Sequence, residues 1–400
     1  MPVLWPLVAM MLVQAMTMLA VVTMPVLAPA LSADVGIDSY VIGLYQSSVF
    51  AGAAVLTLFS GSLVRRYGGV RVNQMSLVVA VTALLVALNG QTTTLLACAL
   101  GVGMGYGLAT PGASHVLARV SPAARRGLVF SLKQSAVPVG GMIAGLLIPP
   151  IADNFGWRPA VITVAVIIAL AIICVQPLRD RLDDDRDPQF KLSVGAPWQA
   201  VLLVIRTPSL RPMAVVAFTF GAMQLCLFAF LVTFLVDRVT LSLVVAGAVF
   251  SVMQGAGVVA RIVWGWLSDR LATSRTLLTI IGVGIILSTL TANEMTPGWP
   301  LFTIMLVSAV MGATAVGWNG IYLAEVARVV SQEQVGAATG GVLMFTFIGI
   351  VVGPSTFGLL VQQTGAYTAG FALMNAFVGI AVLMLLFGKN RTESGRAHEN

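Results

Sequence analysis

The chain has 400 residues, of which 58% are hydrophobic and only 9% are charged. Because soluble domains contain about 25% charged residues, this composition excludes an ordinary soluble protein and indicates a membrane protein. The net charge of +7 would also suit a nucleic-acid partner, but the positions of the basic residues follow a membrane topology instead, so we expect no nucleic-acid partner.

Apolar segments long enough to cross a bilayer recur along the whole chain. A transmembrane helix needs roughly 20 residues to cross about 30 Å of hydrocarbon, and these runs are long and continuous, which favours helices over short alternating strands. The predicted spans are residues 4–28, 39–62, 73–90, 95–117, 127–151, 158–177, 213–237, 244–267, 276–293, 300–325, 336–362 and 369–388. The sequence therefore predicts an all-α membrane protein with twelve transmembrane helices.

The basic residues set the expected orientation. With both termini inside the cell, Arg158 and Arg238 fall outside and Lys133 and Arg261 fall within the membrane, which leaves 18 of the 22 Lys and Arg residues on the cytoplasmic side. Such an excess is typical of cytoplasmic loops. We expect a multi-pass protein of the cytoplasmic (inner) membrane, in contact with membrane lipid, with both termini in the cytoplasm.

Few polar residues interrupt the first six spans. Gln14 and Gln46, together with Gln224 in the seventh span, are candidates to line a central cavity. His115, near the end of the fourth span, has two interpretations: a structural residue bonded to its neighbours, or a contact for substrate or protons.

Lys133 is the charged residue of the fifth span, and Gln134 follows it; both are candidates to bind a substrate. Charges inside a membrane are rare, costly and usually functional. The alternative is that Lys133 extends along the helix to the cytoplasmic surface.

The polar segment 178–212 is the longest interruption and divides the spans six and six. We expect an N-terminal six-helix bundle (1–177), a cytoplasmic linker (178–212), a C-terminal six-helix bundle (213–388) and a cytoplasmic tail (389–400). Residues 198–205 fit either a short helix lying on the membrane surface or a plain connection.

The eighth span contains Arg261, and Gln254 lies two helical turns earlier on the same face. All 15 acidic residues fall in loops, tails or helix ends, so Lys133 and Arg261 form a positive pair without a counter-charge, and we expect an anion as their partner. The alternative for Arg261 is a structural bond to a helix end or to main-chain carbonyls. In the tenth span, Asn319 and Tyr322 share a face and are candidates either to line a cavity or to bond neighbouring helices.

Parts of the first half recur in the second. The segment Gly61-Ser-Leu-Val-Arg65-Arg66 corresponds, 204 positions later, to Gly265-Trp-Leu-Ser-Asp269-Arg270. Four further matches follow at an offset of 209: Ala118-Arg119, Gly127, Gly140 and Gly156 recur as Ala327-Arg328, Gly336, Gly349 and Gly365. Duplicated halves predict two pseudo-symmetric bundles with a site between them, as in transporters.

These loop segments resemble the motif Gly-x-Leu-Ala-Asp-Arg-x-Gly-Arg of the major facilitator superfamily, a resemblance that extends over the whole chain and implies that fold. It implies a cytoplasmic gate in which Asp269 meets the start of the fifth span near Gly127. The first copy has Arg65 where the family has Asp. The residues expected at this gate are Asp269, Arg270, Arg65, Arg66, Glu325 and Arg328.

Arg261, four residues before the loop glycine Gly265, resembles the substrate-binding Arg of the monocarboxylate transporters and of the oxalate/formate antiporters. The resemblance implies an organic-anion substrate. This chain has Gly257 where the monocarboxylate group has an Asp that takes part in proton coupling, and its Lys lies on the fifth span rather than the eleventh.

We therefore expect a secondary active transporter that moves a small organic anion, a mono- or dicarboxylate, by alternating access, as symport or antiport with protons or a counter-anion. The alternative is a drug or multidrug efflux antiporter, whose Gly-Pro-x-x-Gly-Gly element is partly resembled by Pro138-Val-Gly140-Gly141. We expect no enzymatic activity, since no nucleophile and base stand at a recognisable spacing. No cofactor, no metal and a monomeric protein are also expected.

Overall fold

The computed structural model describes residues 3–122, 126–192, 197–270, 273–330 and 335–387, apart from the side chains of residues 39, 126–128, 197–198, 269 and 335–337. The first six long helices are α1 (Leu4–Val35), α2 (Ser39–Tyr67), α3 (Gly69–Ala87), α4 (Thr92–Val120), α5 (Arg126–Phe155) and α6 (Trp157–Val175). The linker contains η2 (Gln176–Leu178), α7 (Arg179–Leu182) and α8 (Pro197–Arg206). The second half contains α9 (Arg211–Asp237), α10 (Leu243–Arg270), α11 (Ser274–Asn293), α12 (Leu301–Met311), η3 (Gly312–Val316), α13 (Asn319–Arg328), α14 (Val335–Thr364) and α15 (Tyr367–Phe387).

The described residues contain 12 helices that are long and apolar enough to cross a membrane, with α12, η3 and α13 counted as one. The prediction of an all-helical membrane protein is confirmed. Most helices run a few residues beyond the apolar stretches that predicted them, as α4 does with Thr92–Val120 against 95–117. Helical hydrogen bonding continues past the apolar part of a helix, so hydropathy alone underestimates its length. A helix also forms at α8, which decides between the two interpretations of that segment.

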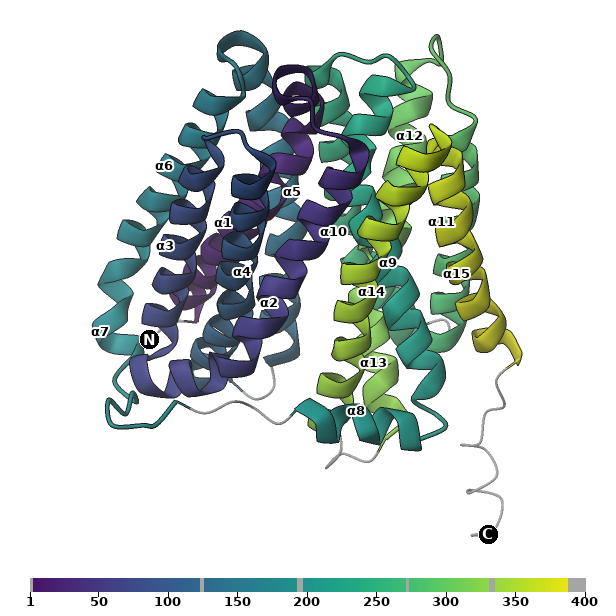
Figure 1. Cartoon of the computed structure of the whole chain (residues 1–400). Coiled ribbons are helices and arrows are strands. Elements are labelled where there is room, and N and C mark those ends of the chain that lie inside the picture. Colours follow the sequence, from purple (N-terminus) through teal and green to yellow (C-terminus); the bar gives the residue numbers. More distant parts are fainter. Residues whose placement is uncertain (1–2, 123–125, 193–196, 271–272, 331–334, 388–400) are drawn as a thin grey trace, which may run out of the picture.

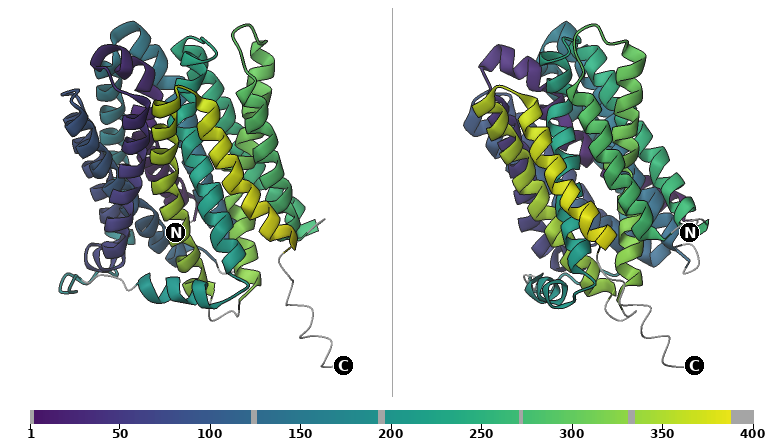
Figure 2. Two further views of the ribbon diagram at one scale, coloured as in Figure 1. Left: turned by 45° about the vertical axis from the view of Figure 1, so that its right-hand side comes forward. Right: turned by 90° about the vertical axis from the view of Figure 1, so that its right-hand side faces the viewer.

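The helices of the two halves stand as two groups side by side, with the linker below them (Figure 1). Two rotated views show α8 lying across the lower ends of the second group (Figure 2). We call this lower side the linker side. The first long helix of each half is the most buried of its group. In the apolar stretches of α1 and α9, 83% and 89% of the residues are buried. Each half is therefore built around its own first helix.

The repeated glycines have the same structural role in both halves. Gly140 of α5 packs against the main chain of Ala15 on α1, and Gly349 of α14 packs against the main chain of Phe218 on α9; a Cβ at either glycine would lie about 2.2 or 2.1 Å from the carbonyl oxygen. Within lipid, helices associate through packing rather than the hydrophobic effect, and small residues allow backbones this close. The sequence repeat thus records one helix pairing made twice.

The described hydrogen bonds between the two groups join α2 to α14 and α5 to α10. Ser355 of α14 donates to Ser47 of α2 at 2.7 Å, and Ser251 of α10 donates to the main-chain oxygen of Met142 on α5 at 2.9 Å. Gly145 of α5 and Gly247 of α10 touch backbone to backbone. Toward the linker side the ribbons of the two groups diverge (Figure 1). The halves are therefore joined through α2 with α14 and through α5 with α10.

Candidate functional site

Lys133 on α5 and Arg261 on α10 meet at a single residue, Gln134. The Nζ of Lys133 donates to Oε1 of Gln134 at 3.2 Å, and Nη1 of Arg261 donates to the main-chain oxygen of Gln134 at 2.7 Å. Because α5 and α10 belong to opposite halves, the two cations reach this residue from both sides of the interface. The sequence predicted the pair, and the fold brings it together.

The acceptors around this pair are neutral. Lys133 is only 1% exposed, which does not fit a lysine that extends to the surface. Arg261 donates to the carbonyls of Gln134 and Val316, at 2.7 and 3.2 Å, so the structural alternative for this residue describes its present bonds. Among the described residues, however, neither cation forms an ion pair with Asp or Glu. An ammonium has three donors and a guanidinium five, so both retain capacity for an anionic acceptor.

One turn of π-helix, η3, supports Arg261 from the tenth span. It supplies the carbonyl of Val316 to Arg261 and that of Ala313 to the indole of Trp264 at 2.7 Å. Such turns frequently mark functional sites because they widen the helix and redirect its carbonyls. Gly257 packs against Val316 in the same region, where an added Cβ would lie 2.7 Å from the Val316 side chain. The carboxylate that the monocarboxylate group has at this position would therefore not fit without rearrangement.

Three of the predicted cavity glutamines are buried and have polar atoms without a hydrogen-bond partner among the described residues. Both amide atoms of Gln46 on α2 and of Gln254 on α10 lack a partner among the described residues, as does Nε2 of Gln14 on α1. The Oε1 of Gln14 accepts from Thr110 at 3.0 Å. Buried amides without partners are costly and need an explanation. Gln254 lies against Gly141, where any larger residue would displace its amide.

The residues predicted on α9 and α13 form a group of their own. The Oε1 of Gln224 accepts from Nε1 of Trp318 at 3.1 Å and from Nδ2 of Asn319 at 3.5 Å. The hydroxyl of Tyr322 donates to the main-chain oxygen of Met213 at 3.2 Å. These contacts join α9 to α13, so the structure brings Asn319 together with Gln224 and uses Tyr322 to bond neighbouring helices.

His115 lies at the linker side and contacts the linker. Its Nε2 is 2.7 Å from Oδ2 of Asp185, and Arg119, one turn on, pairs with Asp184 and Asp185 at 2.7 Å. The structure therefore places His115 in a surface ion-pair group, not beside Arg261. This is the arrangement expected from its structural interpretation.

Asp183 anchors the linker to the first residues of α3. Its carboxylate accepts from the main-chain N–H groups of Val70 and Arg71 at 2.8 and 2.9 Å, where the helix dipole favours a negative charge. Gly68, at φ +91°, has no side chain to clash with it; a Cβ there would lie 2.2 Å from the carboxyl carbon. Burial raises the pKa of Asp183, and the two N–H donors partly offset this rise. Arg119 lowers the pKa of Asp184.

Arg65 also contacts the linker. Its guanidinium lies over the ring of Phe190, 4.2 Å from the centroid, and its main-chain oxygen accepts from the N–H of Asp187 at 2.8 Å. We call residues 183–190 the linker clasp, because they attach the linker to the N-terminal group through α2, α3 and α4. Part of the linker clasp is formed with Arg65, which stands where the family motif has Asp. The sequence analysis did not predict the linker clasp.

The other predicted gate residues lie at the linker side. Glu325 and Arg328 of α13 form a two-bond ion pair at 2.7 and 2.8 Å. Arg66 and Arg270 stack on Tyr67 and Trp266, which lie close to them on the same helix. The side chains of Asp269 and of the first residues of α5 lie outside the described part, so the contact predicted between them stays a prediction.

Tyr106 of α4 is a second residue that the sequence reasoning missed. It lies near Arg261 and packs edge-on against Phe50 of α2. A tyrosine in an apolar span has no sequence signal that separates it from the core.

Comparison with known proteins agrees with this architecture. The model of the Major Facilitator Superfamily matches residues 8–321. A hexuronate transporter of Bacillus subtilis is 24% identical over 373 residues, 90% of this chain and 88% of that protein. A probable sulfoacetate transporter of Cupriavidus necator is 24% identical over 404 residues, 92% and 89% of the two chains.

Among solved structures, a mutant form of the nucleoside transporter NupG superposes with a TM-score of 0.78 at 14% sequence identity, over 95% of this chain and 99% of that one. At this identity the likeness concerns the fold alone. These relatives are transporters rather than enzymes, and those from Bacillus subtilis and Cupriavidus necator are named for organic anions. With a family model that covers most of its length and twelve spans in two related halves, the chain belongs to the Major Facilitator Superfamily.

Proposed function

We propose that this protein is a secondary active transporter that moves a small organic anion, a mono- or dicarboxylate, across the cytoplasmic membrane by alternating access. The observation that carries the proposal is the meeting of Lys133 and Arg261 at Gln134. Two cations from opposite halves share this residue, and no described acidic side chain forms an ion pair with either.

A carboxylate suits both cations. The guanidinium is planar and binds two carboxylate oxygens through parallel N–H bonds, whereas the ammonium contributes a compact charge. Buried charges without a partner are strongly unfavourable, so an anion that enters between them removes a cost already built into the fold. Two of the protein's relatives are named for hexuronate and sulfoacetate, both organic acids, which supports this substrate class.

The position of the pair supports alternating access. The bond from Arg261 to Gln134 crosses the interface between the halves, so a substrate held by both cations links its binding to their relative position. Transporters of this kind bind at the midplane between their repeats and expose the site to one side at a time. The bond from Arg261 lies closer to the linker side than the bond between Ser251 and Met142 does, so the halves are still joined there. By the positive-inside rule that side is the cytoplasm.

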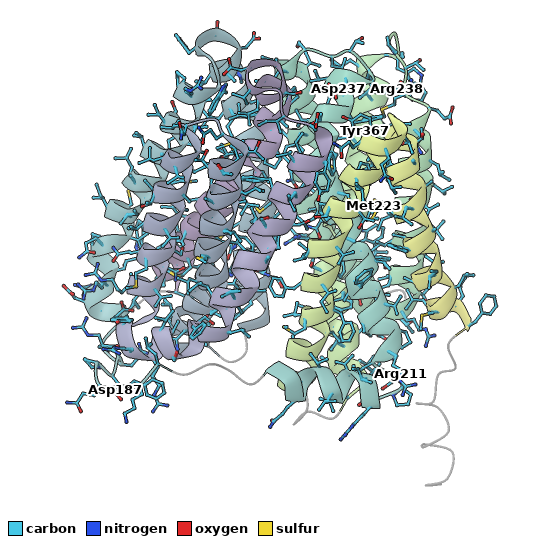
Figure 3. All side chains as sticks on the ribbon, viewed as in Figure 1. Asp187, Arg211, Met223, Asp237, Arg238 and Tyr367 are labelled. Atoms are coloured by element: carbon cyan, nitrogen blue, oxygen red, sulfur yellow. The ribbon has the colours of Figure 1, made fainter. Side chains whose placement is uncertain are left out.

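The proposal is tested by thermal unfolding of the purified protein with a panel of carboxylates and sulfonates. A ligand that binds only the folded state stabilises it by about 2.7 kcal/mol at a hundredfold excess over its Kd. We expect at least one organic anion to raise the unfolding temperature, and Arg261→Lys to remove that rise because Lys lacks the planar fork. Arg238→Gln, an exposed cation at the far end of α9 (Figure 3), is the matched control and should retain it.

Two results would count against the proposal. If an organic anion stabilises Arg261→Lys as much as the wild type, a planar guanidinium is not what recognises the carboxylate. Stabilisation by amphipathic cationic drugs, unaffected by Lys133→Met, would favour the efflux alternative instead.

A further inference from the structure

A groove opens at the linker side of the second group of helices, between α8, α9 and α14. It encloses about 380 Å³. Its lining includes Val204, Ile205, Arg211, Val215, Phe218 and Phe345. It contains no residue of the candidate site described above.

Among the described residues that line the groove, Arg211 is charged and the others are apolar. Val215, Phe218 and Phe345 are partly exposed, so the groove is open to its surroundings. Arg211 is exposed, and its Nε donates to the main-chain oxygen of Ile205 at 3.0 Å, which holds the guanidinium at the edge of the groove. Among the described residues Arg211 forms no ion pair with Asp or Glu.

The charged edge and the apolar part lie at different depths in the membrane. Arg211 is the first residue of α9 and lies at its linker-side end, next to α8 (Figure 3). Phe218 lies seven residues further along the helix, which is about 10 Å deeper at 1.5 Å per residue. Helix α8 lies across this end and contacts α14 where Gly341 meets the main chain of Ala200. The groove therefore runs from a cation at the membrane boundary toward the hydrocarbon.

We propose that this groove binds one anionic phospholipid of the surrounding leaflet. An acyl chain lies along Val215, Phe218 and Phe345, and the phosphate pairs with Arg211. Arg206, which ends α8 and is exposed, adds a second cation on the same side. The polarity of the groove matches that of a lipid, with its charge at the boundary and its chain directed inward. Each basic residue near a membrane surface contributes about 1 kcal/mol to the attraction of anionic lipid.

The experiment measures lipid bound to the purified full-length protein by native mass spectrometry, with phosphatidylglycerol and phosphatidylcholine added separately. We expect one phosphatidylglycerol to bind more tightly than phosphatidylcholine. Arg211→Gln should weaken phosphatidylglycerol about fivefold, the factor that ~1 kcal/mol represents at 25 °C, and Arg211→Lys should retain most of the preference. Arg238→Gln, at the other end of α9, is the matched control and should leave it unchanged.

Val215→Trp tests the apolar part, because an indole there fills the groove. It should lower the occupancy of both lipids, while thermal unfolding without added lipid reports whether each variant is folded. Equal binding of the two lipids by the wild-type protein, or an unchanged preference in Arg211→Gln, would overturn the proposal. Undiminished occupancy in a folded Val215→Trp protein would do the same.

Discussion

Two groups of cationic residues in this protein differ in how their charge is balanced. At the linker side, Arg119 pairs with both Asp184 and Asp185, and His115 contacts Asp185. Within the spans α5 and α10, Lys133 and Arg261 contact only neutral oxygen atoms among the described residues. Within the described part of the chain, counter-charges stand beside the first group and not beside the second.

The difference teaches how to separate structural from functional charge. Ion pairs at the surface are worth little individually, since water and salt screen them, so the clasp acts as an attachment made of several contacts. Inside the membrane an unbalanced charge is costly and persists where function requires it. Four predictions test this distinction, in order of expected effect.

The largest effect is expected at the unbalanced pair. Arg261→Ala and Lys133→Met should each lower substrate transport in proteoliposomes at least about 30-fold, which corresponds to the ~2 kcal/mol typical of losing one partner of a buried charged pair. Both should still accumulate as folded protein, because removing an unpaired charge relieves rather than creates a buried imbalance. Size-exclusion profiles of the purified variants check folding, with Arg238→Gln as the control. Loss of folded protein would make the two residues structural.

A smaller effect, on stability rather than transport, is expected at Asp183. Asp183→Ala should lower the free energy of unfolding by about 1 kcal/mol, the usual cost of removing a side chain that caps a helix, because the N–H groups of Val70 and Arg71 lose their acceptor. Thermal unfolding of the variant measures this, with transport assayed in parallel. A strong loss of transport without loss of stability would show that the clasp takes part in the transport cycle.

A still smaller effect is expected at Asp184, whose pair with Arg119 is exposed. Arg119 lowers the pKa of Asp184 below its ordinary value, so the contribution of the pair to stability is complete above that value and is lost as the pH falls through the lowered pKa. The difference in unfolding temperature between wild type and Asp184→Asn should therefore stay constant from about pH 5 to pH 8. A difference that changes across this range would mean that another group titrates with the pair.

The smallest effect is expected at His115. Because His115 contacts the linker and not Arg261, anion-for-anion exchange in proteoliposomes should persist without a pH gradient and should survive His115→Gln. Uptake that depends strictly on an inward proton gradient and is lost in this variant would contradict the comparison, since it would make a residue of the balanced group the proton carrier.

Sequence reasoning found the individual residues better than their partners. Lys133 and Arg261 were found because charge inside an apolar run is visible in a single chain, and the repeat of Gly140 as Gly349 was visible as a spacing. Gln134 was predicted as a substrate contact, but the bond from Arg261 to its main-chain oxygen was not, because a main-chain oxygen carries no sequence signal. Asp183 belongs to the segment predicted as a polar cytoplasmic linker, and its burial against α3 was not predicted.

What the sequence determined by itself is what hydropathy and charge control locally: twelve membrane-spanning helices, an expected orientation and a related pair of halves. Each of these depends on the transfer of short segments between water and lipid, which neighbouring residues decide. The tertiary structure alone decided which distant groups meet. Main-chain carbonyls become partners for Arg261, and linker carboxylates for Arg119, only when packing brings separate segments together, and that packing depends on shape over the whole chain.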